Sequence, residues 1–189
     1  IVFDWDGTAV MSRKEDATKV RLLLEELLKL GVHIVVITGT NFGNVDRQLS
    51  SFITGPHKRR LYVCTNRGSE VYGFDSVSRP VLIYGRRATA EEESLLTRSA
   101  EEVRDAIVAR SGLDIQLITN RLNRRKIDLI PVPEWSDPPK WAIGDLLVAT
   151  EKRLKEGGIA GGIREVFQFA VERARELGLQ DARITSDVK

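Results

Sequence analysis

Cysteine is nearly absent from this chain: Cys64 is the single one in 189 residues, so no internal disulfide can form. Cys64 lies in an apolar run, where a buried, reduced thiol is the usual state, and this favours a cytoplasmic protein. Long apolar runs are lacking as well, because no stretch approaches the roughly 20 residues that a membrane-spanning helix needs. The sequence therefore excludes a disulfide framework and predicts no membrane partner.

Net charge is also small. The 29 basic and 27 acidic side chains leave a formal charge of +2, although 30% of the residues are charged. Proteins that bind nucleic acid or an anionic surface usually carry an excess of basic residues. With 42% apolar residues, the chain is also not a disordered tail. We expect a folded chain of one or two domains that does not bind nucleic acid.

The two ends of the sequence favour an excerpt from a longer protein. The chain begins on Ile1, inside a predicted strand, and it stops at Lys189, just after another apparent strand. The absence of a signal peptide is therefore weak evidence about location.

The first forty residues have the pattern of a parallel α/β sheet. The apolar run 1–3 ends abruptly in the polar segment Asp4 to Thr8, which is typical of a buried strand with a functional carboxyl end. Apolar residues then recur every three or four positions over 17–28, which predicts an amphipathic helix. A second, mostly β-branched run over 32–37 ends at Thr38. Strand, helix and strand together predict a β-α-β unit.

The later elements follow from periodicity and turn residues. Thr89 and Glu92 predict a capping box for a helix that ends at Gly112. The other expected elements are helices over 44–53, 137–155 (with Asp137 as N-cap) and 163–177, and strands over 60–65, 69–74, 81–84, 114–119, 126–132 and 182–185. The predicted fold class is α/β, with a Rossmann-like parallel sheet over residues 1–85 and a second, α+β domain over 86–189.

Two carboxylates, Asp4 and Asp6, stand one residue apart at the end of the first strand. Like charges held this close raise each other's pKa unless a cation or a ligand relieves them. One carboxylate can attack an electrophile while the other transfers protons, and a divalent metal can offset the charge. Thr38 and Gly39 end the next strand and can hold an anion such as phosphate. This set predicts phosphoryl transfer through an aspartyl intermediate.

The segments Ile1 to Thr8 and Ile34 to Gly39 resemble the first two motifs of the haloacid dehalogenase-like superfamily of phosphohydrolases. The resemblance implies that Asp4 is the nucleophile and becomes phosphorylated, and that Asp6 is the general acid/base. It also implies that Thr38, with Gly39, binds the transferring phosphoryl group. Mg²⁺ would be bound by the Asp4 carboxylate and the Asp6 backbone carbonyl. The second aspartate favours a phosphatase over a dehalogenase.

The position of the second domain resembles the large α/β caps of the Cof-type and phosphomannomutase-like branches. The segment Thr65 to Gly68 fits these branches too. The resemblance makes four residues candidates for binding the substrate: Asn66 in this segment, and Arg121, Arg124 and Arg125 in a predicted cap turn. For the three arginines, a solvated turn is an equal alternative.

Two further motifs of the superfamily are expected beyond Lys189: a lysine that steadies the phosphoryl group and a Gly-Asp pair that completes the Mg²⁺ site. Lys140 and the pair Gly144-Asp145 offer these residue types, but they lie in a helical pattern with no apolar strand before it, so we reject them. We therefore expect residues 1–189 alone to be inactive.

Structural interpretations compete with these assignments. A calcium loop from Asp4 to Glu15 has its glycine at the wrong position and no helix before it. A plain turn also accommodates Asp and Gly, and Thr38 can simply end a strand or cap a helix. The basic run His57 to Arg60 has no interleaved aromatic residues and favours a solvated loop.

The sequence as a whole favours a Mg²⁺-dependent phosphatase of a small phosphorylated metabolite, such as a sugar phosphate, that works through an aspartyl-phosphate on Asp4. A phosphomutase of the same superfamily is the nearest alternative. A catalytically silent phosphate-binding or regulatory module is the alternative from another class. Whether the protein forms a homodimer is left open.

Overall fold

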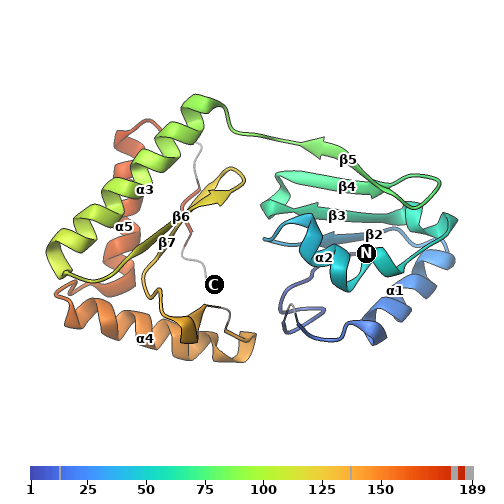
Figure 1. Cartoon of the computed structure of the whole chain (residues 1–189), viewed down its shortest axis with the longest axis horizontal. Coiled ribbons are helices and arrows are strands. Elements are labelled where there is room, and N and C mark those ends of the chain that lie inside the picture. The colour runs from blue at the N-terminus through green and yellow to red at the C-terminus, as the bar shows by residue number, and fades with distance from the viewer. Residues whose placement is uncertain (13, 137, 180–182, 186–189) are drawn as a thin grey trace. The chain divides into compact units, whose positions relative to one another are not determined.

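The computed structural model describes residues 1–12, 14–136, 138–179 and 183–185. The chain divides into two compact units, Ile1–Arg87 (unit 1) and Ala88–Lys189 (unit 2), which Figure 1 shows in colours from blue to red. The division falls close to Gly85, where the character of the sequence changes. In the described part of the chain, no helix combines the length and the apolar character that crossing a bilayer requires.

Unit 1 is built on a five-stranded sheet in its described residues. The strands lie side by side in chain order: β1 (Val2–Asp4), β2 (Ile34–Ile37), β3 (Leu61–Thr65), β4 (Glu70–Phe74) and β5 (Pro80–Gly85). The first three run parallel, and β4 and β5 are added antiparallel. The helices are α1 (Thr18–Lys29) and α2 (Phe42–Gln48), with 3-10 turns at Ser50–Phe52, Pro56–Arg60 and Asn66–Gly68. The predicted β-α-β unit is confirmed.

One face of this sheet is buried under α1 and α2. Ile34 and Val36 of β2 and Leu61 and Val63 of β3 are fully buried, in one cluster with Leu28 of α1. Burying a side chain of this size contributes roughly 1.5–3 kcal/mol. Because successive residues of a strand point to opposite faces, this burial also fixes the side chains that follow each strand.

The second helix of unit 1 is shorter than predicted. The sequence predicts one helix over 44–53, but α2 begins at Phe42 and ends at Gln48. Leu49 has φ −129° and ψ −71°, outside the helical range, and a separate 3-10 turn follows over Ser50–Phe52.

Two side chains of unit 1 differ from expectation in their burial. Lys58 is buried instead of solvated: its ammonium lies 4.3 Å from the centre of the Phe74 ring and donates to the Ser78 carbonyl at 3.0 Å. Burial lowers the pKa of Lys58. Cys64 is half-buried instead of buried, and its partial burial raises the pKa of the thiol, which keeps the thiol protonated.

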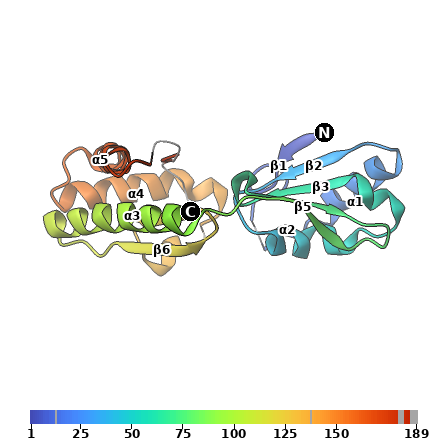
Figure 2. The same ribbon diagram turned by 90° about the horizontal axis from the view of Figure 1, so that it is seen from above.

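Unit 2 combines helices with a β-hairpin. Its described elements are α3 (Ala90–Ser111), β6 (Gln116–Arg121), β7 (Arg124–Asp128), α4 (Ile143–Glu156) and α5 (Gly162–Glu176), with 3-10 turns at Pro133–Trp135 and Lys140–Ala142. Helix α3 packs against both the hairpin and α5, and Figure 2 shows it between α5 and β6. The core between these layers includes Val103, Ile107 and Leu154.

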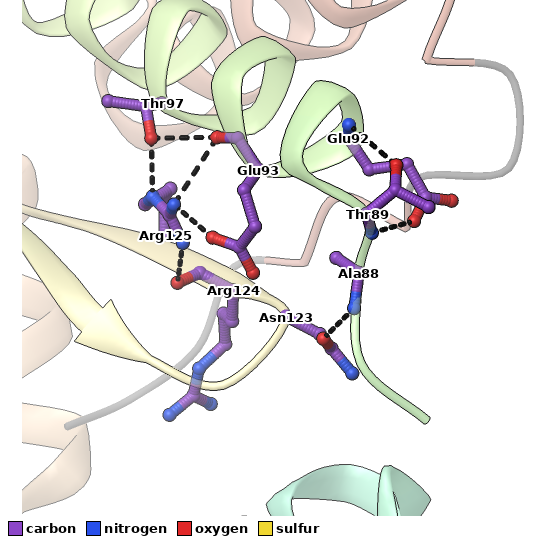
Figure 3. Close-up of polar contacts among 8 residues, drawn as sticks. All are labelled: Ala88, Thr89, Glu92, Glu93, Thr97, Asn123, Arg124 and Arg125. Atoms are coloured by element: carbon purple, nitrogen blue, oxygen red, sulfur yellow. Dashed lines mark hydrogen bonds and ion pairs between the residues drawn. The ribbon is translucent and has the colours of Figure 1, made fainter. Parts of the chain in front are cut away.

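The capping box predicted for α3 is present. The Thr89 hydroxyl accepts the Glu92 N–H at 3.2 Å, and the Glu92 carboxylate accepts the Thr89 N–H at 2.8 Å. Figure 3 shows both bonds. The helix ends at Gly112, whose φ of 64° is the left-handed conformation that glycine adopts without strain.

Two predicted boundaries and one predicted strand of unit 2 are wrong. Helix α4 starts at Ile143 instead of near 138, because a 3-10 turn over Lys140–Ala142 follows the two prolines; the predicted cap Asp137 lies outside the described residues. Strand β7 ends at Asp128, whose carboxylate accepts the Ile130 N–H at 3.1 Å and turns the chain. Residues 183–185 form no strand, and no described strand pairs with them; residue 182 lies outside the described part.

An ion-pair network joins α3 to α5. Glu102 of α3 accepts hydrogen bonds from Arg173 of α5 and, at 2.9 Å, from Arg98. Arg173 also donates to Glu176 at 2.6 Å. The hydrogen bond from Arg173, followed by the one from Arg98, lowers the pKa of Glu102 to about 2.

We predict that Glu102→Gln lowers the thermal midpoint of unit 2 at neutral pH. A carboxyl group with a lowered folded pKa adds stability above its ordinary pKa, which is 4.5 here, and this stability is lost as the pH falls toward 2. The midpoint difference between wild type and variant, measured by circular dichroism, should therefore shrink over that range. Glu156→Gln, in an exposed pair with Lys152, is the control and should change little. A difference that is independent of pH would contradict this account.

Candidate functional site

Three parallel strands of unit 1 end at one edge of the sheet, which we call the carboxyl edge. In the parallel register Asp4 lies beside Ile37, and Ile37 lies beside Cys64. The segments that follow these strands, 5–8, 38–40 and 66–68, therefore begin at the same edge of the sheet. The carboxyl edge of such a sheet is where ligands bind in open α/β folds.

Trp5 lies between the two aspartates and anchors them. Its side chain is 1% exposed, and its indole Nε1–H donates to Oε1 of Gln48 at 3.1 Å. Its backbone N–H donates to the Ile37 carbonyl at 2.9 Å, which continues the pairing of β1 with β2 beyond Asp4. The buried Trp5 ring thus fixes the chain between the two carboxylates. Asp4 is exposed and Asp6 is half-buried.

The chain turns sharply after Asp6. Gly7 has φ 91°, which a residue with a side chain adopts only with strain, and its N–H donates to the Val10 carbonyl at 2.6 Å. The amide of Gln48 then holds the next segment, by donating to the carbonyls of Ser12 (3.1 Å) and Glu15 (3.0 Å). Gln48 therefore connects the tight turn at Gly7 to the core through Trp5.

Thr38 binds directly to Asp6. Its hydroxyl donates to Oδ2 of Asp6 at 2.6 Å, and it accepts the Thr40 N–H at 3.1 Å. Thr38 is fully buried because it continues the alternation of Ile34 and Val36 along β2. The structure thus brings together two of the residues that the sequence singled out, from strands separated by a whole helix.

The loop after β3 lies against the loop after β2. The N–H of Asn66 donates to the Thr40 carbonyl at 2.8 Å, and the N–H of Arg67 donates to the Thr38 carbonyl at 3.2 Å. Asn66 and Arg67 have φ values of 49° and 59°, in the left-handed region. Each such residue costs on the order of 1–3 kcal/mol, so contacts with residues 38–40 must offset the strain.

Glu70 holds the side chain of Asn66. Its buried carboxylate accepts the Asn66 amide at 2.8 Å and the Thr65 hydroxyl at 3.3 Å, and the Arg87 guanidinium lies 3.9 Å away. Burial, and then the charge of Glu70, raises the pKa of Tyr72 beside it. Asn66 therefore has a structural contact at the carboxyl edge, and its role toward a substrate stays a prediction.

The three predicted arginines lie on the β6–β7 hairpin of unit 2. Arg121 and Arg124 lie opposite each other at its tip. Arg125 is held inside unit 2: its Nε donates to the Thr97 hydroxyl at 2.8 Å, and its guanidinium pairs with Glu93 of α3, as Figure 3 shows. Arg125 thus has a structural role within unit 2. The roles of all three toward a substrate remain predictions.

The donor atoms at the carboxyl edge fit Mg²⁺ only in part. Asp4 and Asp6 supply carboxylate oxygens, the ligand type that Mg²⁺ prefers. No group of three or more His, Cys, Asp or Glu side chains suited to a metal occurs in the described ranges. Because Mg²⁺ usually takes one or two carboxylates and completes its shell with water and phosphate oxygens, these residues fit an ion shared with a bound phosphate and not an all-protein cage.

Sequence reasoning missed Gln48, Thr40, Glu70 and Arg67. The missed signal for Arg67 is an arginine between asparagine and glycine directly after an apolar strand, where turns favour small residues. Gln48 carried no signal, because its partners are distant in the sequence.

We predict that Thr38→Val lowers the free energy of unfolding of unit 1 by about 1–3 kcal/mol, because it leaves the buried Thr40 N–H without its hydroxyl acceptor. Thr38→Ser keeps the hydroxyl and is the matched control. Urea unfolding can be followed by the fluorescence of Trp5 after Trp135 and Trp141 are replaced by Phe. Equal losses in the Val and Ser variants would show that the methyl group, and not the hydrogen bond, matters.

No family model matches the chain, and no curated protein matches its sequence. Solved structures do resemble it. An IMP-nucleotidase from Plasmodium falciparum superimposes with a TM-score of 0.58 over 95% of this chain, at 10% identity. An IMP-bound mutant of that protein gives 0.52 over 82% at 12% identity, and an ATP-bound form gives 0.50 over 82% at 11% identity.

The chain spans 42%, 44% and 40% of the lengths of these three structures, respectively. At such low identity the likeness concerns the fold. It confirms the fold class expected from the sequence, α/β with a Rossmann-like parallel core.

Proposed function

We propose that this chain supplies the nucleophile and the general acid/base of a Mg²⁺-dependent phosphatase that acts on a small phosphomonoester. The observation that carries the proposal is the 2.6 Å hydrogen bond from Thr38 to Asp6, at the sheet edge where Asp4 also ends its strand. The structural likeness to an IMP-nucleotidase supports a phosphohydrolase.

Asp4 acts as the nucleophile. Its side chain is exposed at the end of β1. One carboxylate oxygen attacks phosphorus, the bond from phosphorus to the leaving oxygen breaks, and an aspartyl-phosphate forms. Water then attacks this phosphorus, the bond to the Asp4 oxygen breaks, and phosphate leaves.

Asp6 transfers the protons in both steps. It donates one to the leaving oxygen in the first step, and it takes one from the attacking water in the second. Before substrate binds, the Thr38 hydroxyl donates to this carboxylate at 2.6 Å. Mg²⁺ bound by the Asp4 carboxylate and the Asp6 carbonyl would supply positive charge that offsets the charge of the phosphoryl group.

Thr38 and Gly39 hold the phosphoryl group. A threonine hydroxyl has one proton to donate, and in this structure that proton goes to Asp6. Binding of a phosphoryl oxygen by Thr38 therefore requires that the hydroxyl exchange Asp6 for the substrate. Gly39 adds a backbone without a side chain of its own, and the Arg67 side chain lies against it.

Two classes of phosphomonoester are the first to test as substrates. The sequence favours a sugar phosphate, and the likeness to IMP-nucleotidase structures favours a nucleoside monophosphate. We further propose that unit 2 is a cap of the Cof-type or phosphomannomutase-like kind, with Arg121 and Arg124 as substrate-binding residues. We also propose that the protein is cytoplasmic.

A phosphomutase uses the same first step and differs in the acceptor. It returns the phosphoryl group to the substrate, so it releases no stoichiometric phosphate. Measurement of free phosphate during turnover separates this alternative from the phosphatase.

We predict that Asp4→Asn abolishes phosphate release by the full-length protein, because the amide cannot attack phosphorus. Asp6→Asn should lower kcat by roughly 10²–10⁴-fold, the usual contribution of a general acid/base. Phosphate release from p-nitrophenyl phosphate, a sugar phosphate and IMP measures both. Asp105→Asn, on the exposed side of α3, is the control. An Asp4→Asn variant that turns over normally would falsify the mechanism.

We also predict that removal of divalent metal with EDTA abolishes phosphate release and that added Mg²⁺ restores it. Ca²⁺ should restore less, because it tolerates looser coordination geometry than Mg²⁺. Full activity in EDTA, after dialysis against the chelator, is the contrary outcome.

A further inference from the structure

Arg67 has a backbone conformation that does not suit an arginine. Its φ of 59° and ψ of 38° lie in the left-handed region, where glycine is unstrained and other residues are not. Glycine would satisfy this backbone, and the next residue, Gly68, adopts φ 87°. The strain at Arg67 therefore calls for a reason in its side chain.

Two backbone hydrogen bonds fix the position of the Arg67 main chain, from which the side chain extends. The Arg67 N–H donates to the Thr38 carbonyl at 3.2 Å, and the Asn66 N–H donates to the Thr40 carbonyl at 2.8 Å. The loop is thus attached on both sides of Gly39. Its strained conformation is held by the residues that lie beside Asp6.

The Arg67 side chain passes over Gly39. A Cβ atom built on Gly39 would lie 3.9 Å from both Cγ and Nε of Arg67, so the stem and the start of the guanidinium lie against the backbone of residue 39. Arg67 is exposed, whereas Thr38 beneath it is fully buried. The guanidinium therefore lies on the solvent side of the carboxyl edge, where a bound anion would arrive.

The negative charge at the carboxyl edge favours a cation at the position of the Arg67 guanidinium. Asp4 and Asp6 make the carboxyl edge acidic, and a phosphoryl group brings further negative charge. Lys58 is not placed to offset it, because its ammonium is buried on the Phe74 ring and bound to the Ser78 carbonyl. An arginine offers planar, paired N–H donors that match the oxygens of a phosphoryl group.

We propose that Arg67 is a phosphate-binding residue, whose guanidinium contacts the oxygens of the phosphoryl group held at Thr38 and Gly39. The inference deepens the proposed function and rests on it, since it places the phosphoryl group at the carboxyl edge. The left-handed backbone of Arg67 carries the guanidinium over Gly39.

The experiment measures binding of inorganic phosphate to the full-length protein by titration calorimetry in Mg²⁺, so its readout does not depend on turnover. Arg67→Gln and Arg67→Gly should each weaken phosphate binding tenfold or more, and Arg67→Lys should weaken it less. Arg59→Gln removes the same charge from an exposed position of unit 1 and should leave binding unchanged.

Stability separates a ligand role from a structural one. Arg67→Gly should keep or raise the thermal midpoint of unit 1, since glycine takes φ 59° without strain. Phosphate binding within twofold of wild type in Arg67→Gly and Arg67→Gln would overturn the inference, and so would equal weakening in Arg59→Gln. Failure of the proposed function shows separately, as turnover that survives Asp4→Asn.

Discussion

Burial of the Trp5 side chain is the constraint on which the candidate site depends. The buried ring fixes the chain between two aspartates, of which Asp4 is exposed and Asp6 accepts a hydrogen bond from the hydroxyl of the buried Thr38. The hydrogen bond from its indole to Gln48 ties this arrangement to α2, and Gln48 in turn holds the carbonyls of Ser12 and Glu15. The burial of one ring thus fixes the position of the segment that carries both carboxylates.

The parallel register of β1, β2 and β3 supplies the remaining parts. The alternation that buries Ile34 and Val36 also buries Thr38, and this brings its hydroxyl to Asp6. The same register brings the loop after β3 onto residues 38–40, where backbone hydrogen bonds hold Arg67 in a strained conformation. Core packing and site geometry are therefore consequences of one pattern of burial along the strands.

The sequence predicts those features that depend on local pattern or on sheet topology. The capping box of Thr89 and Glu92 is set by residues three apart, and the meeting of Asp6 with Thr38 follows from strands that end at one edge. Features that depend on contacts between distant residues were missed. Gln48 is 43 residues from Trp5. The position of the Arg67 side chain depends on backbone dihedral angles that the residue types alone do not predict.

The central claim is that Asp4 becomes phosphorylated during turnover. The most direct measurement is an acid quench of the full-length protein during hydrolysis of a phosphomonoester, followed by peptide mass spectrometry. The account predicts a hydroxylamine-labile phosphoryl group on the peptide that contains Asp4. When Asp6 is replaced by Asn, which cannot take the proton from water, this group should accumulate from p-nitrophenyl phosphate, whose leaving group needs no proton. Turnover with no phosphoryl group on Asp4, or with one on another residue, would contradict the account.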